Sequence, residues 1–324
     1  MHPLTPDPAL IARFRADLES ITGRSPDGDA RLGIAVSGGP DSVALLLLAA
    51  AAYPGGVVAA TVDHRTRPET AAESGFVRDL CARIGVPHTI LAAPEPPPAE
   101  GNLQDWARSV RYALLGKWAS DHAAPWVATA HQQDDVAEGF LMRARRGSGV
   151  GGLAAMAAVR PLEEVSLVRP LLGWSRAALE AIVSGAGIEP VADPSNANPR
   201  FDRSRIRALL AETPDLPADK LALSAANLRH AEDALVWLAG REWVERSQVD
   251  ANAVSVDIRG LPYEIRRRLA QRAVLHFAPG WQGAGIDALT AALDSGQPGT
   301  IAEVQARPVS GKWRFNPAPP RRSH

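Results

Sequence analysis

Residues 33–42 read Gly33-Ile34-Ala35-Val36-Ser37-Gly38-Gly39-Pro40-Asp41-Ser42, and an apolar run over 43–52 follows directly. A buried strand therefore passes through two glycines into a helix. Gly38 and Gly39 let the backbone turn tightly and approach a ligand, and Pro40 suits the first helical position. The free amides of the turn and the helix dipole together favour an anion. We expect this loop to hold phosphates, with the hydroxyls of Ser37 and Ser42 as further donors.

The loop differs from the two common phosphate-binding motifs. It lacks the Gly-Lys-Ser/Thr ending of a Walker A loop and the third glycine of a dinucleotide fingerprint. It carries Asp41 instead, which would repel phosphates unless a metal ion lay between them. Asp41 therefore predicts Mg²⁺ bound together with ATP. An ordinary glycine turn with an aspartate cap is the alternative, and the preceding strand and following apolar helix disfavour it.

Composition limits the class of protein. The chain has 324 residues, 46% hydrophobic and 22% charged, which suits a globular protein of two domains. The lone Cys81 excludes an internal disulfide and a cysteine metal cluster. The first 25 residues lack a signal-like apolar stretch, and the apolar run over 43–52 is shorter than the roughly 20 residues that span a bilayer. We expect a cytoplasmic protein without a membrane partner.

The order of apolar and amphipathic segments predicts a Rossmann-like parallel α/β sheet with flanking helices. Strands are expected over 33–36, 56–62, 88–92 and 126–130, and helices over 41–52, 71–84, 103–122, 134–145, 175–185 and 204–212. A linker over 213–217 divides a catalytic ATP-binding domain, 1–213, from a smaller, mainly helical α+β domain, 214–324, with a disordered tail over 317–324. The long helix over 218–246 has an apolar face that packs on the first domain or on a second subunit, which leaves a homodimer open.

Net charge is −1, which argues against nucleic-acid binding through overall charge but leaves room for a local basic face. Arginines gather in three groups, at positions 143, 145 and 146, at 200, 203, 205 and 207, and at 266, 267, 268 and 272. Solvated helix faces with carboxylate partners are as good an explanation of each group as ligand binding.

Further motifs accompany the phosphate loop. They are Val62-Asp63-His64-Arg65-Thr66-Arg67; Gly101-Asn102-Leu103-Gln104-Asp105-Trp106-Ala107-Arg108 with Arg111-Tyr112; Thr129-Ala130-His131-Gln132-Gln133-Asp134-Asp135-Val136-Ala137-Glu138; Arg146-Gly147-Ser148-Gly149; Val168-Arg169-Pro170-Leu171-Leu172; and Asp193-Pro194-Ser195-Asn196 with Phe201, Arg203, Arg205 and Arg207.

The loop resembles that of the N-type ATP pyrophosphatases, also called the PP-loop superfamily. With the other motifs, in this order and spacing, residues 30–212 resemble the tRNA(Ile)-lysidine synthetases. The resemblance implies that ATP adenylates the carbon-2 oxygen of the wobble cytidine in the CAU anticodon of tRNA(Ile), releasing pyrophosphate. The ε-amine of free L-lysine then displaces AMP to give lysidine. The implied enzyme is an ATP-dependent carbon–nitrogen ligase whose partners are this tRNA and lysine.

The motif after the fourth strand suits this chemistry. Lysine's ε-amine must lose a proton before it attacks, and a carboxylate can hold the ammonium and help remove that proton. Asp134 and Glu138 are i,i+4 neighbours at the end of a parallel strand, where α/β sheets bind ligands. The resemblance carries Asp41, His131, Asp134, Asp135 and Glu138 into the catalytic centre, with His131 orienting a phosphate or carboxylate. The alternative is that Asp134 and Asp135 only cap the N-terminus of a surface helix.

Four arginines are assigned to tRNA or phosphate contacts. Arg108 and Arg111 lie three apart on a helix, although ion pairs with Asp105 or Asp121 would explain them equally well. The resemblance implies RNA or transition-state contacts for Arg203 and Arg207, which are i,i+4 neighbours. Such contacts would give the RNA affinity a salt dependence. Asp193 and Asn196 are expected to fix the turn before that helix.

Two positions depart from the family pattern, which usually has Gln and Thr where this chain has Val136 and Gly139. Three other functions are compatible with the loop alone. A tRNA thiolase would need more cysteines than Cys81. An amide-forming synthetase would lack its glutamine-hydrolysing domain and leave the arginines unused. A nucleotide-binding regulatory module would not turn over ATP.

Overall fold

The computed structural model describes residues 4–65, 70–94, 103–191 and 202–318. Their contacts divide the chain into two compact units, Met1–Arg229 and His230–His324. This division falls inside a long helix, α9 (Ala218–Arg246). The functional boundary between 213 and 214 stays a prediction. The predicted turn at 193–196 and the last six residues of the predicted tail lie outside the described residues.

The first unit is built on a six-stranded sheet with the order β3-β2-β1-β4-β6-β5. Its strands are β1 (Leu32–Ala35), β2 (Val57–Asp63), β3 (His88–Ala92), β4 (Trp126–Ala128), β5 (Val159–Leu162) and β6 (Val165–Val168). All neighbours are parallel except β5, which is antiparallel to β6. The predicted Rossmann-like α/β class is confirmed, and the β5–β6 hairpin adds an edge that the motif spacing did not predict.

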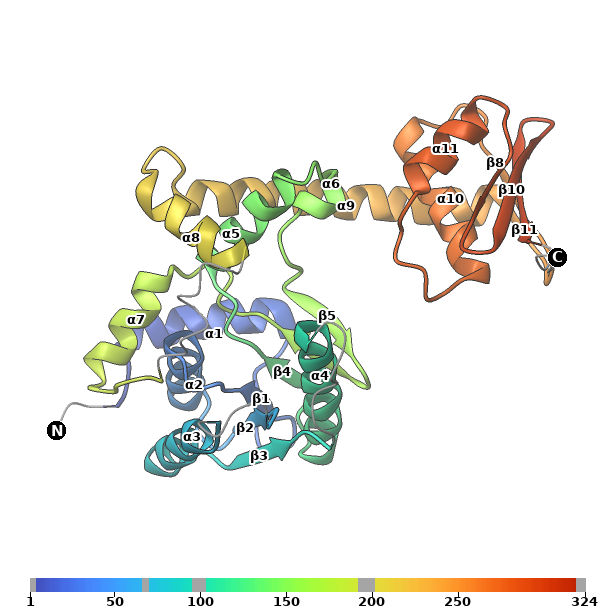
Figure 1. The fold of residues 1–324 in the computed structure, drawn as a ribbon. Helices are drawn as coiled ribbons and strands as arrows, with labels where there is room; N and C mark the ends of the chain where they lie inside the picture. Colours follow the sequence, from blue (N-terminus) through green and yellow to red (C-terminus); the bar gives the residue numbers. More distant parts are fainter. Residues whose placement is uncertain (1–3, 66–69, 95–102, 192–201, 319–324) are drawn as a thin grey trace. The chain divides into compact units, whose positions relative to one another are not determined.

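Helices cover both faces of this sheet (Figure 1). They are α1 (Pro8–Thr22), α2 (Pro40–Ala52), α3 (Thr70–Ile84), α4 (Leu103–Asp121), α5 (Gln133–Ala144), the short α6 (Val150–Leu153), α7 (Arg176–Gly185) and α8 (Asp202–Glu212). One core joins α1, α2, α3 and α7 to the sheet, and a second core lies between α4 and the other face. Helix α1 has no counterpart among the predicted helices.

The strand–loop–helix unit at the centre follows from its sequence. Helix α2 is buried on nearly all sides because α1, α7 and the sheet surround its apolar run. Gly38 has a φ of +89°, a conformation that side-chain-bearing residues rarely adopt, and a Cβ there would lie 3.1 Å from Cγ2 of Val191. Gly33 in β1 lets Trp118 pack closely, since a Cβ would lie 2.9 Å from its ring. Glycine therefore sets both the turn and the packing of α4.

The second unit has its own antiparallel sheet of order β7-β8-β11-β10-β9. The strands are β7 (Ser247–Val249), β8 (Val254–Asp257), β9 (Gly299–Ile301), β10 (Val304–Val309) and β11 (Lys312–Pro317), and the helices are α10 (Tyr263–Phe277) and α11 (Ile286–Asp294). Trp313, Phe315 and Leu269 are fully or almost fully buried in its core. Helices and strands both occur as predicted, with more strands than the sequence indicated. None of the described helices is long and apolar enough to cross a membrane.

Candidate nucleotide-binding and catalytic site

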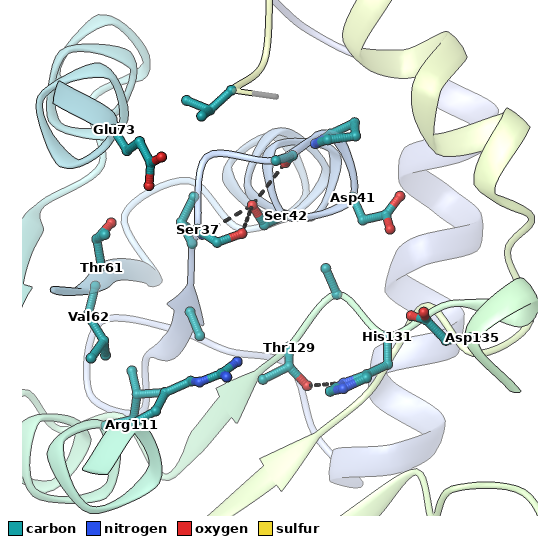
Figure 2. A pocket seen from close by; sticks show the side chains of 18 of the residues that line it. Ser37, Asp41, Ser42, Thr61, Val62, Glu73, Arg111, Thr129, His131 and Asp135 are labelled. Atoms are coloured by element: carbon teal, nitrogen blue, oxygen red, sulfur yellow. Dashed lines mark hydrogen bonds between the residues drawn. The ribbon is translucent and has the colours of Figure 1, made fainter. Parts of the chain in front are cut away.

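A cavity of about 570 Å³ opens at the carboxyl ends of β1, β2 and β4. Open α/β sheets bind their ligands at this edge. Figure 2 shows the phosphate loop on one side of the cavity, with Arg111 of α4 on the wall across from it and His131 and Asp135 beyond β4. Of the predicted loop residues, all except Gly38 line the cavity.

Ser42 holds the phosphate loop in shape. Its hydroxyl donates to the carbonyl of Gly39 at 2.9 Å and accepts from the amide of Ser37 at 3.2 Å. The hydroxyl of Ser37 lies 3.2 Å from that of Ser42. Gly38 acts through the backbone, because its carbonyl accepts from the amide of Val191 at 3.0 Å. The N-terminus of α2, which begins at Pro40, therefore faces the cavity with a fixed loop before it.

Asp41 and Asp135 bring two carboxylates to the cavity from different elements. Burial and the charge of Asp135 together raise the pKa of Asp41 to about 6, against the opposing charge of Arg176. Burial also raises the pKa of Asp135. Oδ1 of Asp41 is buried and accepts no hydrogen bond from any described residue. An acceptor without a donor beside a second carboxylate suits a cation.

The pair fits Mg²⁺ in particular. Magnesium is commonly held by one or two carboxylates together with substrate phosphates. Among the described residues no group of three or more potential protein ligands lies together. Asp41 and Asp135 would therefore hold the ion jointly with phosphate oxygens supplied by the nucleotide.

His131 is neutral in its surroundings. Burial and the charges of four arginines together lower the pKa of its imidazole to about 3; the arginines are Arg169, Arg203, Arg108 and Arg111. Its Nδ1 lies 3.0 Å from Oγ1 of Thr129, which fixes the ring. Since the ring carries no positive charge near neutral pH, it can act as a hydrogen-bonding group but does not supply a cation.

Asp134 and Glu138 are engaged with neighbouring helices and do not line the cavity. Oδ2 of Asp134 accepts from the amide of Arg176 at 2.9 Å, and its own amide donates to the side chain of Gln132. Glu138 is 1% exposed and lies 2.9 Å from Nη2 of Arg176, 2.9 Å from Nε of Arg207 and 3.6 Å from Nε of Arg203. The i,i+4 pair therefore binds protein groups, and its assignment to the catalytic centre stays a prediction.

Three of the four predicted arginines line the cavity: Arg111, Arg203 and Arg207. Arg108 lies beside it, with its guanidinium 5.0 Å from the ring centre of Tyr112. Asp121, one of the two carboxylates considered as a partner for Arg108 or Arg111, pairs with Lys117 at 2.8 Å.

Sequence reasoning missed several lining residues. They are His64, Glu73, Ser74, Arg176 and Glu180. Arg176 begins α7 directly after its N-cap, Ser175, whose hydroxyl accepts from the amide of Ala178. The N-cap residue Ser175 indicated the start of the helix, but no local sequence signal indicated that the Arg176 side chain turns toward Glu138.

The strand–Ser-Gly-Gly-Pro-Asp-Ser–helix loop at the carboxyl edge of a parallel sheet defines the class of protein: it is a PP-loop protein. The family model described as "PP-loop domain" matches residues 11–213. A tRNA(Ile)-lysidine synthase of Zymomonas mobilis is 41% identical, with 97% of this chain and 96% of the relative covered. One from Novosphingobium aromaticivorans is 40% identical, with 96% and 95% covered. The chain belongs to the tRNA(Ile)-lysidine synthase family.

A solved structure supports the fold separately. The U34-tRNA thiolase of Methanococcus maripaludis, which holds a [4Fe-4S] cluster, superposes with a TM-score of 0.56 at 15% identity. The match covers 68% of this chain and 78% of the thiolase. At this identity the likeness concerns the fold alone, so it gives the thiolase alternative no support. The family predicted from the motifs is confirmed.

Proposed function

We propose that this protein makes lysidine in tRNA. ATP adenylates the carbon-2 oxygen of the wobble cytidine in the CAU anticodon of tRNA(Ile), and the ε-amine of L-lysine then displaces AMP. The observation that carries the proposal is family membership over nearly the whole chain, with a phosphate loop and two buried carboxylates at one cavity. The reaction would take place in the cytoplasm, where tRNA and free lysine meet.

The phosphate loop supports the ATP half of the reaction. The amides at the start of α2 and the hydroxyls of Ser37 and Ser42 face the cavity, where they would bind phosphate oxygens. Asp41, with Asp135 beside it, would hold Mg²⁺, which neutralises charge on the departing pyrophosphate. His131, neutral and fixed by Thr129, would hydrogen-bond a phosphate oxygen.

The lysine half needs a carboxylate that can reach the substrate. Asp135 lines the cavity, whereas Asp134 and Glu138 are held by Arg176 and its neighbours. We therefore assign to Asp135, in the second step and after pyrophosphate has left with its Mg²⁺, the contact with the ε-ammonium and the acceptance of its proton. Its raised pKa makes it a better proton acceptor than an ordinary aspartate.

Arginines would meet the tRNA. Arg203 and Arg207 of α8 line the cavity and share Glu138, which fixes their guanidinium groups near the predicted position of the reacting base. A homodimer stays a prediction. Its support is that Trp237 and Val244 of α9 are 62% and 79% exposed, and sedimentation of the purified protein tests it.

The test is transfer of labelled lysine into tRNA. Purified enzyme, ATP and Mg²⁺ are incubated with a CAU-anticodon isoleucine transcript and with a version that carries uridine at the wobble position. We expect ATP-dependent label in the first transcript and none in the second. Label in neither, with ATP–pyrophosphate exchange that appears only with another acceptor, would leave the adenylating fold standing and refute the lysidine assignment.

A further inference from the structure

A group of arginines surrounds Tyr112 beside the cavity. Arg108 and Arg111 come from α4, Arg160 from β5, and Arg169 follows β6. The guanidinium carbons of Arg160 and Arg108 lie 4.2 Å and 5.0 Å from the ring centre of Tyr112. We call these four residues the Tyr112 arginine cluster. Its residues come from three parts of the chain. Arg160 and Arg169 were not among the predicted tRNA or phosphate contacts.

The Tyr112 arginine cluster has no carboxylate partner among the residues that the structure describes. Within the described parts of the chain, no carboxylate forms an ion pair with any of its four members. Nε and Nη2 of Arg160 and Nε of Arg169 are buried without a hydrogen-bond partner in the same residues. Burial lowers the pKa of the Arg169 guanidinium, Tyr112 opposes this effect, and the charges of Arg160 and Arg108 add to it. Uncompensated guanidinium groups of this kind are costly unless a ligand completes them.

Most members of the other arginine groups have carboxylate partners, although Arg143 and Arg272 form no ion pair with a described residue. Arg145, Arg146 and Arg205 all pair with Asp202. Arg266, Arg267 and Arg268 pair with Asp294, Glu264 and Glu232. Their carboxylate partners account for those groups as protein ion pairs. In the Tyr112 arginine cluster, by contrast, the described residues supply no carboxylate, and the acidic side chain that acts on the arginines is the phenol of Tyr112, whose pKa they lower against the effect of burial.

The position of the cluster indicates which anion it takes. Arg111 belongs both to the cluster and to the cavity wall, across from the phosphate loop (Figure 2). The phosphates of ATP have their own site at that loop. Arg108 lies one turn before Arg111 on α4 and is exposed, and Arg160 lies beside the same tyrosine ring. An RNA strand that places one base in the cavity could bring a neighbouring phosphate to these arginines.

We propose that the Tyr112 arginine cluster binds a phosphodiester of the RNA strand next to the nucleotide that enters the cavity. Guanidinium groups match phosphate oxygens with paired hydrogen bonds. The ring of Tyr112 and the carbonyl of Ala157, which accepts from Nη1 of Arg169 at 2.5 Å, hold the cluster in place. This inference rests on the proposed function, since it names where that same substrate is held.

The experiment measures binding of a CAU anticodon stem-loop RNA at several KCl concentrations, with MgATP binding measured in parallel. The variants are Arg160→Gln and the exposed Arg108→Gln, and the control is Arg83→Gln. Arg83 is an exposed arginine in the last turn of α3, away from the cavity lining, and its loss changes the charge equally. Arg160→Lys keeps the charge without the planar fork, and unfolding midpoints show that each variant is folded.

We expect each cluster variant to weaken RNA binding roughly five- to tenfold and to reduce the slope of log K against log [KCl] by about 0.7. MgATP affinity and the Arg83→Gln control should match wild type, and Arg160→Lys should recover the slope but only part of the affinity. Unchanged RNA affinity and slope in a folded variant would overturn the inference, as would loss of MgATP affinity alone. If wild-type enzyme modifies the transcript, either of these two outcomes refutes only the inference about the Tyr112 arginine cluster. If wild-type enzyme neither binds nor modifies RNA, the proposed function fails with it.

Discussion

Glu138 on α5 accepts a hydrogen bond from Nε of Arg207 on α8 at 2.9 Å, although 69 positions separate them along the chain. The glutamate side chain is 1% exposed, and Arg176 and Arg203 approach the same carboxylate. One buried carboxylate therefore arranges three guanidinium groups that line the cavity. We therefore expect Glu138 to act on catalysis indirectly, by positioning the arginines that line the cavity.

Replacing Glu138 tests that role. Glu138→Gln leaves three guanidinium groups without their buried counter-charge, so we expect the free energy of unfolding to fall by roughly 2–4 kcal/mol. Lysine incorporation should fall as well, because Arg203 and Arg207 lose their fixed positions. Urea unfolding and the lysine-transfer assay measure the two effects.

Asp202→Asn is the matched control for this variant. Asp202 also binds three arginines, Arg145, Arg146 and Arg205, but at the exposed start of α8. Water screens such pairs, so we expect the control to change stability and activity little. Equal effects of Glu138→Gln and Asp202→Asn would contradict the positioning role.

Asp41→Asn should stabilise the ligand-free protein at neutral pH while it abolishes activity. The pKa of Asp41 rises from 3.8 to about 6, so the folded state binds this proton more tightly than the unfolded state does. The free energy of unfolding therefore falls as pH rises from about 4 to 6, and ionised Asp41 costs roughly 2–3 kcal/mol above that range.

Asparagine removes this cost, so Asp41→Asn should be more stable than wild type at pH 7.5 and nearly equal to it at pH 4. Urea unfolding without nucleotide or Mg²⁺ at both pH values measures the difference. Loss of stability at pH 7.5 would show that the carboxylate is already satisfied by the protein. Added MgATP should raise the unfolding midpoint of wild type but not that of the variant.

His131 should stay neutral across the physiological range. Its imidazole pKa is lowered to about 3, so its NMR signals should not titrate between about pH 5 and 8, where an ordinary histidine does. His131→Ala should lower kcat/KM by about 10²-fold without moving either limb of the pH profile. If the pH profile of kcat/KM of the wild type had a limb near pH 6.5 that is absent in His131→Ala, the assignment of His131 as neutral would be refuted. Thr129→Val frees the ring and should cause a smaller loss.

Val136 departs from the family pattern for a packing reason. It is 2% exposed, lies in a cluster with Ala155, Ala222 and Ala225, and does not line the cavity. Val136→Gln would bury an amide among these residues, so we expect a loss of about 1–3 kcal/mol of stability with activity kept in the folded fraction. Thermal unfolding and kcat measure the two.

Gly139→Ala is the companion test on the same helix. Its Cβ would lie 3.2 Å from Nη1 of Arg143, the flexible end of a side chain that can shift. The clash therefore opposes a helix-propensity gain of up to about 1 kcal/mol, and we expect a small net change in the unfolding midpoint. A loss as large as that of Val136→Gln would mean that Arg143 is fixed in place.

The parallel sheet and the phosphate loop were predictable because they depend on local sequence. Strand and helix periods reflect side-chain directions on the backbone, and the Gly38–Gly39 turn reflects the conformations open to glycine. Helix α1 and the β5–β6 hairpin lacked so clear a local signal. Family membership was predictable because several motifs occur in a fixed order.

The sequence by itself therefore determined the fold class, the phosphate loop and the carboxylate in it, since each depends on residues close along the chain. Only the tertiary structure decided that Glu138 turns toward Arg207 while Asp135 turns toward Asp41. Adjacent turns of one helix can face different neighbours, and which neighbours they meet depends on how α7 and α8 pack. Arg160 was beyond sequence reasoning for the same reason, because its place beside Tyr112 comes from the packing of a strand against α4.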